Sequence, residues 1–300
     1  MGSLTDRLAV QGRIKPPPWL KNSIQYETIM GSRAYGCSDL DSSDTDIYGF
    51  CVPPKEMIFP HLAGEIVGFG KVRAPRFDQF LAYHVKTEHT EYDITIFSIV
   101  KYFQLCLENN PNMIDSLFTP RNCVCHSTMI GELVRENRRL FLHKGAWFKF
   151  KGYSYSQMHK LKTKNPEGKR VETIAKYGYD IKFAYHVVRL LNEVEQILTD
   201  GDIDLQRNRE QLKAIRRGDW TEFQVEDYFN TKEKALEALY ATSPLRHSPN
   251  EGALKQLLLN CLEQHYGSLD KCVTVTSEAY VKGALLEIQA TIAEVLKKIP

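Results

Sequence analysis

Two short motifs near the start of the chain combine residue types that bind phosphate and divalent cations. Gly31 is followed by Ser32, and Asp44 and Asp46 stand two positions apart. A glycine lets the backbone approach phosphate oxygens closely, and the serine adds a hydroxyl and an amide donor. Side chains two apart on a strand point to one face, so Asp44 and Asp46 can share metal ions. Transfer of a nucleotidyl group needs both features, a cradle for the triphosphate and carboxylates that hold two divalent ions.

A third carboxylate on another strand is expected to complete such a site. The segment Tyr92–Phe97 is rich in β-branched and aromatic residues, which predicts a strand. Glu91, Asp93 and Thr95 alternate along it and share one face. Asp93 is our choice for the third acid because it lies inside an apolar strand, where an unpaired charge is costly. Glu91 is the reserve candidate, and a structural ion pair is the alternative role for Asp93.

A later segment carries three basic side chains at helical spacing. Lys182, His186 and Arg189 fall at i, i+4 and i+7, on one face of a helix predicted over 171–198. Apolar residues occupy another face, which suits the core. We expect the basic face to look across a cleft at the triphosphate, and a solvated helix face is the alternative interpretation.

The elements that position these residues predict an α+β fold. Strands are expected over 26–30 and 46–52, so the glycine-serine turn and the acid pair lie between two strands. A short helix is expected after Ser32, with its free N–H groups directed at the anion. From about residue 128 onward the apolar periodicity is mainly helical. We predict a catalytic core over 1–125, formed by a small mixed sheet flanked by helices, and a helical domain over 126–300 that closes the nucleotide cleft.

Composition narrows the class of protein. The 300 residues include 39 basic and 37 acidic side chains, a formal net charge of +2, which does not favour nonspecific binding to nucleic acid or to an anionic membrane. Seven scattered cysteines form no CxxC pair and are odd in number, which argues against a secreted disulfide framework. The stretch from Met1 to Pro18 lacks the apolar run of a signal peptide. We therefore expect a soluble, cytoplasmic protein with no membrane contact.

Three further features are weaker. The segment over 162–170 carries four basic residues with a proline and a glycine, which predicts a mobile basic loop suited to a polyanionic acceptor. Tyr153 and Tyr155 have a spacing that fits either base stacking or the core. His84 and His89 precede the third strand and are interpreted as ordinary polar residues, because a metal site would need two more ligands nearby.

The chain resembles the DNA polymerase β nucleotidyltransferase superfamily in two stretches, Gly31-Ser32-Arg33-Ala34-Tyr35-Gly36 and Ser43-Asp44-Thr45-Asp46-Ile47-Tyr48-Gly49. More narrowly, it resembles the bacterial and phage branch of RNA-repair-associated polymerase-β-like proteins, in which a helical domain follows the catalytic core. The matching stretches are Asp93-Ile94 with Phe103, Asn110-Pro111-Asn112 and Tyr179 to Leu191. The resemblance implies a polymerase-β-type core with Gly31 and Ser32 at the triphosphate. It also implies Asp44 and Asp46 on metal and Asp93 as the third acid.

These observations predict a metal-dependent nucleotidyltransferase that moves an NMP from an NTP, with ATP favoured, to an acceptor hydroxyl and releases pyrophosphate. Two Mg²⁺ or Mn²⁺ ions are the expected cofactors. An RNA end is the first choice of acceptor, because the family is associated with RNA repair and because the basic loop suits a polyanion. A protein hydroxyl is the second choice, which would make the enzyme an AMP-transferring modifier, and a small molecule is the third. A catalytically silent member that binds nucleotide or RNA is the alternative class, and the oligomeric state is left open.

Overall fold

The computed structural model describes residues 2–37, 44–63, 76–88, 90–163 and 169–268, together with a few single positions beyond 268. The chain divides into two compact units. The first unit joins Met1–Val52 with Asp78–Cys261, and the second joins Pro53–Phe77 with Leu262–Pro300. The division into a core over 1–125 and a helical domain over 126–300 stays a prediction.

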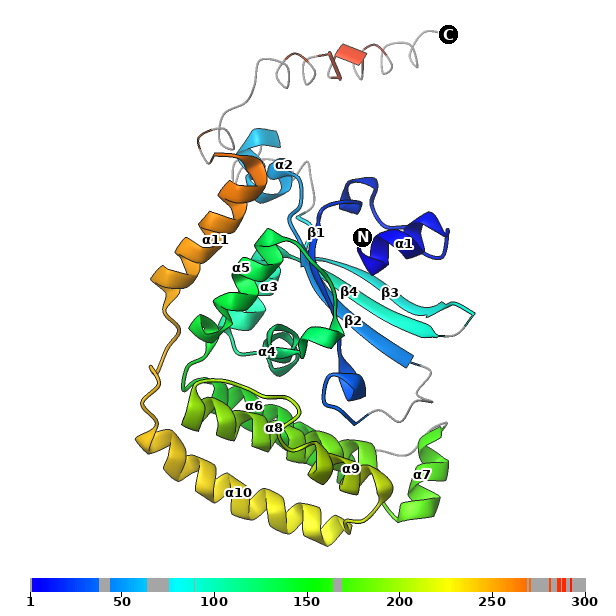
Figure 1. The fold of residues 1–300 in the computed structure, drawn as a ribbon, viewed down its shortest axis with the longest axis vertical. Coiled ribbons are helices and arrows are strands. Elements are labelled where there is room, and N and C mark those ends of the chain that lie inside the picture. Colours follow the sequence, from blue (N-terminus) through cyan, green and yellow to red (C-terminus); the bar gives the residue numbers. More distant parts are fainter. Residues whose placement is uncertain are drawn as a thin grey trace. The chain divides into compact units, whose positions relative to one another are not determined.

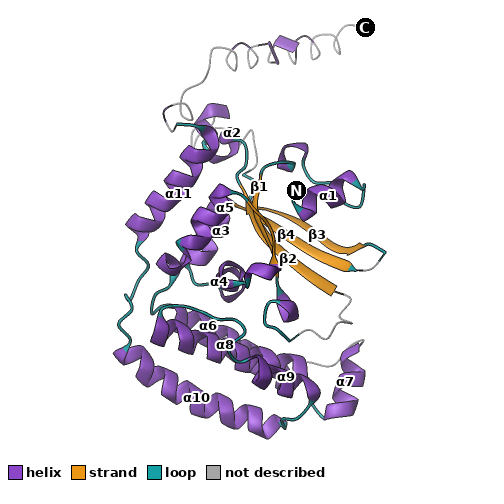
Figure 2. Cartoon of the chain, viewed as in Figure 1, coloured by secondary structure: helices purple, strands orange, loops and turns teal. Residues whose placement is uncertain are grey.

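A five-stranded mixed sheet belongs to the first unit, and β1 to β4 are labelled in Figure 1. The strand order is β3-β4-β2-β1-β5. β2 and β4 run parallel, and the other neighbouring strands run antiparallel. The strands are β1 (Ile24–Ile29), β2 (Asp44–Cys51), β3 (Gln79–Lys86), β4 (Glu91–Ser98) and β5 (Val124–Ser127). With the many helices of the chain (Figure 2), the sheet confirms the predicted α+β class and the small mixed sheet.

β3 is an edge strand that the sequence did not predict. Its register with β4 shifts between Ala82 and Val85, and His84 inside this shift has a φ of 55°. The shift is a β-bulge, which breaks the two-residue period by which strands are recognised. Because of the bulge, the sequence pattern of this segment does not predict a strand.

Aromatic side chains fill one face of the sheet. The ring of Phe50 on β2 lies 5.9 Å from that of Tyr26 on β1 and 4.8 Å from that of Tyr102 on α3 (Ile99–Leu107). The backbone of β2 also approaches β1 closely, because a Cβ on Gly49 would lie 2.1 Å from the Tyr26 carbonyl oxygen. This glycine lets the sheet close at its centre.

A buried hydrogen-bond network lies behind the same face. The Tyr26 hydroxyl donates to the Ser116 carbonyl on α4 (Pro111–Phe118) at 2.8 Å, and Thr28 shares a 2.7 Å hydrogen bond with Thr119. The guanidinium of Arg135 on α5 (Met129–Glu136) donates to the Tyr26 hydroxyl at 2.8 Å. A buried guanidinium is tolerated only with such partners, so the network joins α4 and α5 to the sheet.

The opposite face of the sheet carries α1 (Leu4–Val10). Glu27 of β1 is fully buried, and its carboxylate accepts hydrogen bonds from the Leu4 amide at 2.6 Å and the Thr5 amide at 3.1 Å. Burial raises the pKa of the Glu27 carboxyl, and these hydrogen bonds act in the other direction. The two amide donors compensate for the lost solvation of the carboxyl group and attach the start of α1 to the sheet.

A group of helices follows the sheet along the chain. α8 (Ile181–Asp200) packs against α6, α9 and α10, and most of its side chains are buried. The other helices are α6 (Ala146–Thr163), α7 (Lys169–Tyr177), α9 (Arg209–Arg217), α10 (Glu222–Thr242) and α11 (Glu251–Tyr266). The helical periodicity predicted from about residue 128 onward continues past residue 268, where almost all residues lie outside the described ones.

The single helix predicted over 171–198 is wrong, because the structure has two helices there. Gly178 has a φ of 83° and ends α7, since only glycine adopts this left-handed conformation without cost. Asp180 then begins α8, with its carboxylate accepting from the Lys182 amide at 3.0 Å and from the Phe183 amide at 3.4 Å.

The second unit contains the short helix α2 (Lys55–Ile58) and the end of α11. The Tyr266 hydroxyl donates to the Pro53 carbonyl, and the Phe59 and Tyr266 rings lie 6.3 Å apart. Among the described helices of the chain, none is both long and apolar enough to cross a membrane.

Candidate active site

Acidic residues of two parallel strands lie side by side in the sheet. In the register of β2 and β4, Asp46 is the partner of Asp93 and Asp44 is the partner of Glu91. Partners in register project to the same face of a sheet, and so do residues two apart along one strand. Asp46 is exposed and Asp93 is half-buried, whereas the side chain of Asp44 lies outside the described residues. The register therefore brings the acids predicted from the sequence to one face.

Gly31 lies directly against the carboxylate of Asp46. The Met30 amide donates to the Asp46 carbonyl at 2.8 Å, which joins the end of β1 to the start of β2. Gly31 has a φ of 71°, and a Cβ at this position would lie 2.9 Å from Asp46 Oδ2. No other residue type fits here without strain, so the glycine brings bare backbone beside the acid. The predicted contact of this backbone with phosphate stays a prediction. The adjoining Ser32 is half-buried.

The helix expected after Ser32 is shorter than predicted. The structure has one 3-10 turn over Gly31–Arg33, followed by a further turn through Gly36, whose φ is 65°. A left-handed residue at this position ends helical geometry. The predicted helix is therefore limited to a single turn, and the role of its N–H groups at a phosphate stays a prediction.

His84 is a site residue that the sequence interpretation missed. Because of the bulge in β3, the His84 amide donates to Asp93 Oδ1 at 2.7 Å, and its Nδ1 lies 2.6 Å from Glu91 Oε1. One oxygen of Asp93 is thus held by backbone, and Glu91 is held by the imidazole. The only sequence signal for this role is the imperfect alternation around the bulge, which does not point to a site.

Tyr48 lies on the acid face, two residues after Asp46 on β2. Burial and then the charge of Asp46, with a smaller contribution from Asp93, raise the pKa of Tyr48 to about 12. Tyr48 therefore remains a neutral hydroxyl beside the carboxylates. The hydroxyl of Tyr153 on α6 accepts a 3.0 Å hydrogen bond from the side-chain amide of Asn110, and Tyr153 is 39% exposed. Tyr155 is 45% exposed, and its hydroxyl donates to Glu233. Neither tyrosine of α6 is a core residue.

The turn after Ser32 is fastened to the helices. The Tyr35 hydroxyl donates to the Asp115 carboxylate of α4 at 2.7 Å, and the Gln206 amide donates to the Ala34 carbonyl at 3.3 Å. The Arg216 guanidinium of α9 donates to the Cys37 carbonyl at 2.5 Å. Contacts from several helices thus hold the turn that carries the glycine-serine pair.

The structure corrects the placement of Arg189 in the basic stripe. Its guanidinium is buried and donates to the Asp115 carboxylate, to the Tyr35 hydroxyl at 2.7 Å and to Glu193 at 3.0 Å. Lys182 is exposed and His186 is half-buried. The three basic residues therefore do not form one solvent-facing stripe, because α8 turns its Arg189 face into the core. A phosphate role for Lys182 and His186 stays a prediction.

Two carboxylates share the single guanidinium of Arg189. Burial raises the pKa of Asp115 and raises that of Glu193 well above its usual range. Asp115 also accepts from Tyr35, which favours its charged form. We therefore assign the negative charge to Asp115 and the proton to Glu193.

The donor set of the acid face fits a hard divalent cation. Asp46 and Asp93 offer carboxylate oxygens, which Mg²⁺ prefers, and the bare backbone of Gly31 lies beside Asp46. Within the described side chains, no three His, Cys, Asp or Glu residues gather tightly enough to hold a metal ion. Asp44, which the register places on the same face, is not among those side chains.

Most of the basic loop predicted over 162–170 lies outside the described residues. Lys162 is described, and its ammonium pairs with Glu226 of α10 at 2.7 Å. The contribution of this loop to acceptor binding therefore stays a prediction.

A glycine-serine turn against carboxylates on adjacent strands of a mixed sheet defines a polymerase-β-type nucleotidyltransferase. The sequence profile of the RNA repair pathway DNA polymerase beta family matches residues 18–238, which include the sheet, the acid face and the helices through most of α10. The chain therefore belongs to the RNA repair pathway DNA polymerase beta family.

Two other comparisons add less. A solved structure of a nucleotidyltransferase-like protein from Exiguobacterium sibiricum is similar over 87% of this chain and 79% of its own, with 11% sequence identity and a TM-score of 0.29. No curated protein sequence matches the chain.

Proposed function

We propose that the protein transfers an NMP from an NTP, with ATP favoured, to the terminal hydroxyl of an RNA. The acceptor oxygen attacks the α-phosphorus in line, the bond from the α-phosphorus to the bridging oxygen breaks, and pyrophosphate leaves. The observation that carries the proposal is the register that sets Asp46 beside Asp93, with the backbone of Gly31 against Asp46. Phosphate-binding backbone and acids then lie at one point, as in-line transfer requires.

Each residue of the site has a role in this proposal. The bare backbone at Gly31 and the hydroxyl of Ser32 hold the β- and γ-phosphates. Asp93, held by the His84 amide, faces the acceptor hydroxyl and helps to remove its proton. Lys182 and His186 contribute positive charge toward the triphosphate.

Carboxylates of this type hold divalent ions in polymerase-β-type enzymes. Asp44, Asp46 and Asp93 would hold two Mg²⁺ or Mn²⁺ ions. Bound there, the ions would activate the attacking oxygen and neutralise the charge of the leaving pyrophosphate.

RNA is the favoured acceptor because the description of the matched family names an RNA repair pathway. A cytoplasmic location agrees with that role and stays a prediction. Transfer to a protein hydroxyl and nucleotide binding without catalysis are the competing functions, and the same experiment separates them.

The test uses labelled NTP, Mg²⁺ and separate pools of RNA and protein. We expect label on RNA with wild type, and a loss of at least about a hundredfold in Asp46→Ala and Asp93→Ala, because metal-assisted transfer depends on these oxygens. Asp219→Ala, which removes an exposed acid paired with Arg217, is the matched control and should keep full activity. Label only on protein would overturn the RNA acceptor, and full activity in Asp46→Ala and Asp93→Ala would overturn the site.

A further inference from the structure

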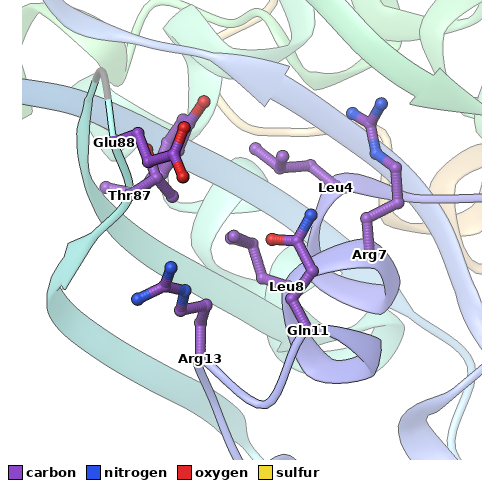
Figure 3. A pocket seen from close by; sticks show the side chains of 8 residues that line it. Leu4, Arg7, Leu8, Gln11, Arg13, Thr87 and Glu88 are labelled. Atoms are coloured by element: carbon purple, nitrogen blue, oxygen red, sulfur yellow. The ribbon is translucent and has the colours of Figure 1, made fainter.

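A cavity of about 620 Å³ lies between α1 and the turn that joins β3 to β4 (Figure 3). Tyr92 lines it, and Tyr92 precedes Asp93 on β4. Neighbouring side chains of a strand point to opposite faces, so the cavity lies on the face of the sheet opposite the acids. Its volume falls within the roughly 300–1,000 Å³ that is usual for small-ligand sites.

Two arginines supply the charge of this cavity. Figure 3 shows Arg7 and Arg13 on its two sides, with Gln11 between them. Over the described part of the chain, neither guanidinium has a hydrogen-bonding or ion-pair partner. By contrast, the exposed Arg207 and Arg217 pair with Asp200 and Asp219 at 2.6 and 2.8 Å. Guanidinium groups without protein partners suit the oxygens of phosphate.

The wall that carries the arginines is firmly attached. The buried carboxylate of Glu27 accepts from the first amides of α1, and Thr5 and Leu8 of that helix are buried. Arg7 therefore extends from a helix that is fixed to the sheet. The Arg13 amide donates to the Leu8 carbonyl of that helix at 2.9 Å, so the backbone of both arginines is attached to the same helix.

The remaining walls add groups that suit the other parts of a nucleotide. Tyr92 offers an aromatic ring for a base, and the side-chain amide of Gln11 suits ribose or base edges. The Thr87 hydroxyl donates to the Thr90 carbonyl at 2.8 Å and shapes the turn. Glu88 in the turn contributes one negative charge against the two positive ones. The lining as a whole combines net positive charge with an aromatic ring, which is typical of single-strand binding.

We propose that this cavity binds the RNA strand just upstream of its reacting end, an inference that rests on RNA as the acceptor. A strand that passes over the start of β4 meets Tyr92 on one face and Asp93 on the other. Arg7 and Arg13 contact its phosphates, and Tyr92 stacks on a base. The reacting hydroxyl then lies at the acid face while the preceding nucleotides are held behind the sheet.

Binding of RNA without NTP tests the cavity directly. The probe is a single-stranded RNA of about twelve nucleotides, within the usual reach of such sites, with a fluorophore at its 5′ end. In Arg7→Gln with Arg13→Gln, we expect at least about tenfold weaker binding and a salt slope shallower by about 1.4, the value for two lost phosphate contacts. Tyr92→Leu should weaken binding about tenfold and leave the salt slope unchanged, because stacking does not release counterions.

The matched control is Arg207→Gln with Arg217→Gln, which makes the same change in net charge elsewhere. It should bind RNA as wild type does. Equal RNA affinity of wild type and the Arg7 and Arg13 variant would overturn the proposal that the cavity binds RNA. An equal loss of affinity in the control variant would do the same, and so would a wild-type protein that binds no RNA. Thermal unfolding of each variant, monitored by circular dichroism, checks that the fold is kept.

Transfer assays separate this inference from the proposed function. With the long RNA, the Arg7 and Arg13 variant should show a raised KM and an unchanged kcat, whereas a dinucleotide acceptor, too short to reach the cavity, should be used equally by variant and wild type. If the KM for the long RNA does not change in this variant, the cavity does not bind the acceptor strand, and RNA remains the proposed acceptor. Label found only on protein, with RNA binding that still depends on Arg7 and Arg13, would overturn the acceptor but leave an RNA site.

Discussion

At the scale of single residues, the site depends on the absence of a side chain. Gly31 has left-handed backbone geometry, and its missing Cβ leaves room for the Asp46 carboxylate. Strain and steric contact are separate effects here. Gly267 allows strain and steric contact to be separated. It also has a positive φ, of 98°, but no atom lies within 4 Å of the place that a Cβ would take.

We predict that Gly31→Ala lowers the transfer rate by about a hundredfold, since a displacement of about 1 Å at a reacting group is enough for such a loss. The free energy of unfolding should fall by about 1–2 kcal/mol from the left-handed backbone alone. Gly267→Ala is the control and should keep the wild-type rate, because a Cβ there meets no other atom. Equal rates for the two variants would show that contact with Asp46 is unimportant.

At the scale of elements, the bulge of β3 decides how the third acid is held. The His84 amide reaches Asp93 because the chain gains an extra residue between Ala82 and Val85 and adopts a φ of 55°. Bulges often re-aim groups at sites on sheet edges. The backbone donor, and not the imidazole, contacts the acid proposed to act in catalysis.

We predict that His84→Val raises the metal concentration needed for half-maximal transfer and lowers kcat about tenfold or more, because a β-branched residue resists positive φ and withdraws the amide from Asp93. His84→Gly, which keeps the amide and suits positive φ, should stay within a few-fold of wild type. Leu81→Val in the same strand controls for a change of side chain at the edge. A loss in His84→Gly as large as in His84→Val would assign the effect to the imidazole.

At the scale of the whole first unit, a buried ion pair connects the glycine-serine turn to the helices. Asp115 of α4 and Arg189 of α8 meet at the Tyr35 hydroxyl, and both charged side chains are almost fully buried. Removing one partner of a buried pair leaves the other charge without compensation. The pair therefore contributes more to the arrangement of these elements than any exposed ion pair does.

We predict that Arg189→Met lowers the free energy of unfolding by about 3–5 kcal/mol, measured by urea unfolding. Asp115→Asn combined with Arg189→Met should lose less than the sum of the single changes, because the orphaned charge is removed as well. Arg207→Met, which breaks the exposed pair with Asp200, should change stability little. Additive losses in the double variant would argue against a direct pair.

The sequence by itself determined the fold class and the family. The spacing of Gly31, Ser32, Asp44 and Asp46, and an acid inside a strand at Asp93, predicted the α+β class and the nucleotidyltransferase family, because these signals are local. Side chains alternate between the two faces of a strand, so Asp44 and Asp46 lie on one face regardless of which strand pairs with theirs.

Only the tertiary structure decided which partners these residues meet. The period of α8 is the same whether Arg189 faces solvent or core, so its pairing with Asp115 and Glu193 depended on how the helix packs. His84 reaches Asp93 through a bulge that breaks the strand pattern. Arg7, Arg13 and Tyr92 line one cavity because Glu27 attaches α1 to the sheet. Such long-range contacts are made by folding, and no local spacing encodes them.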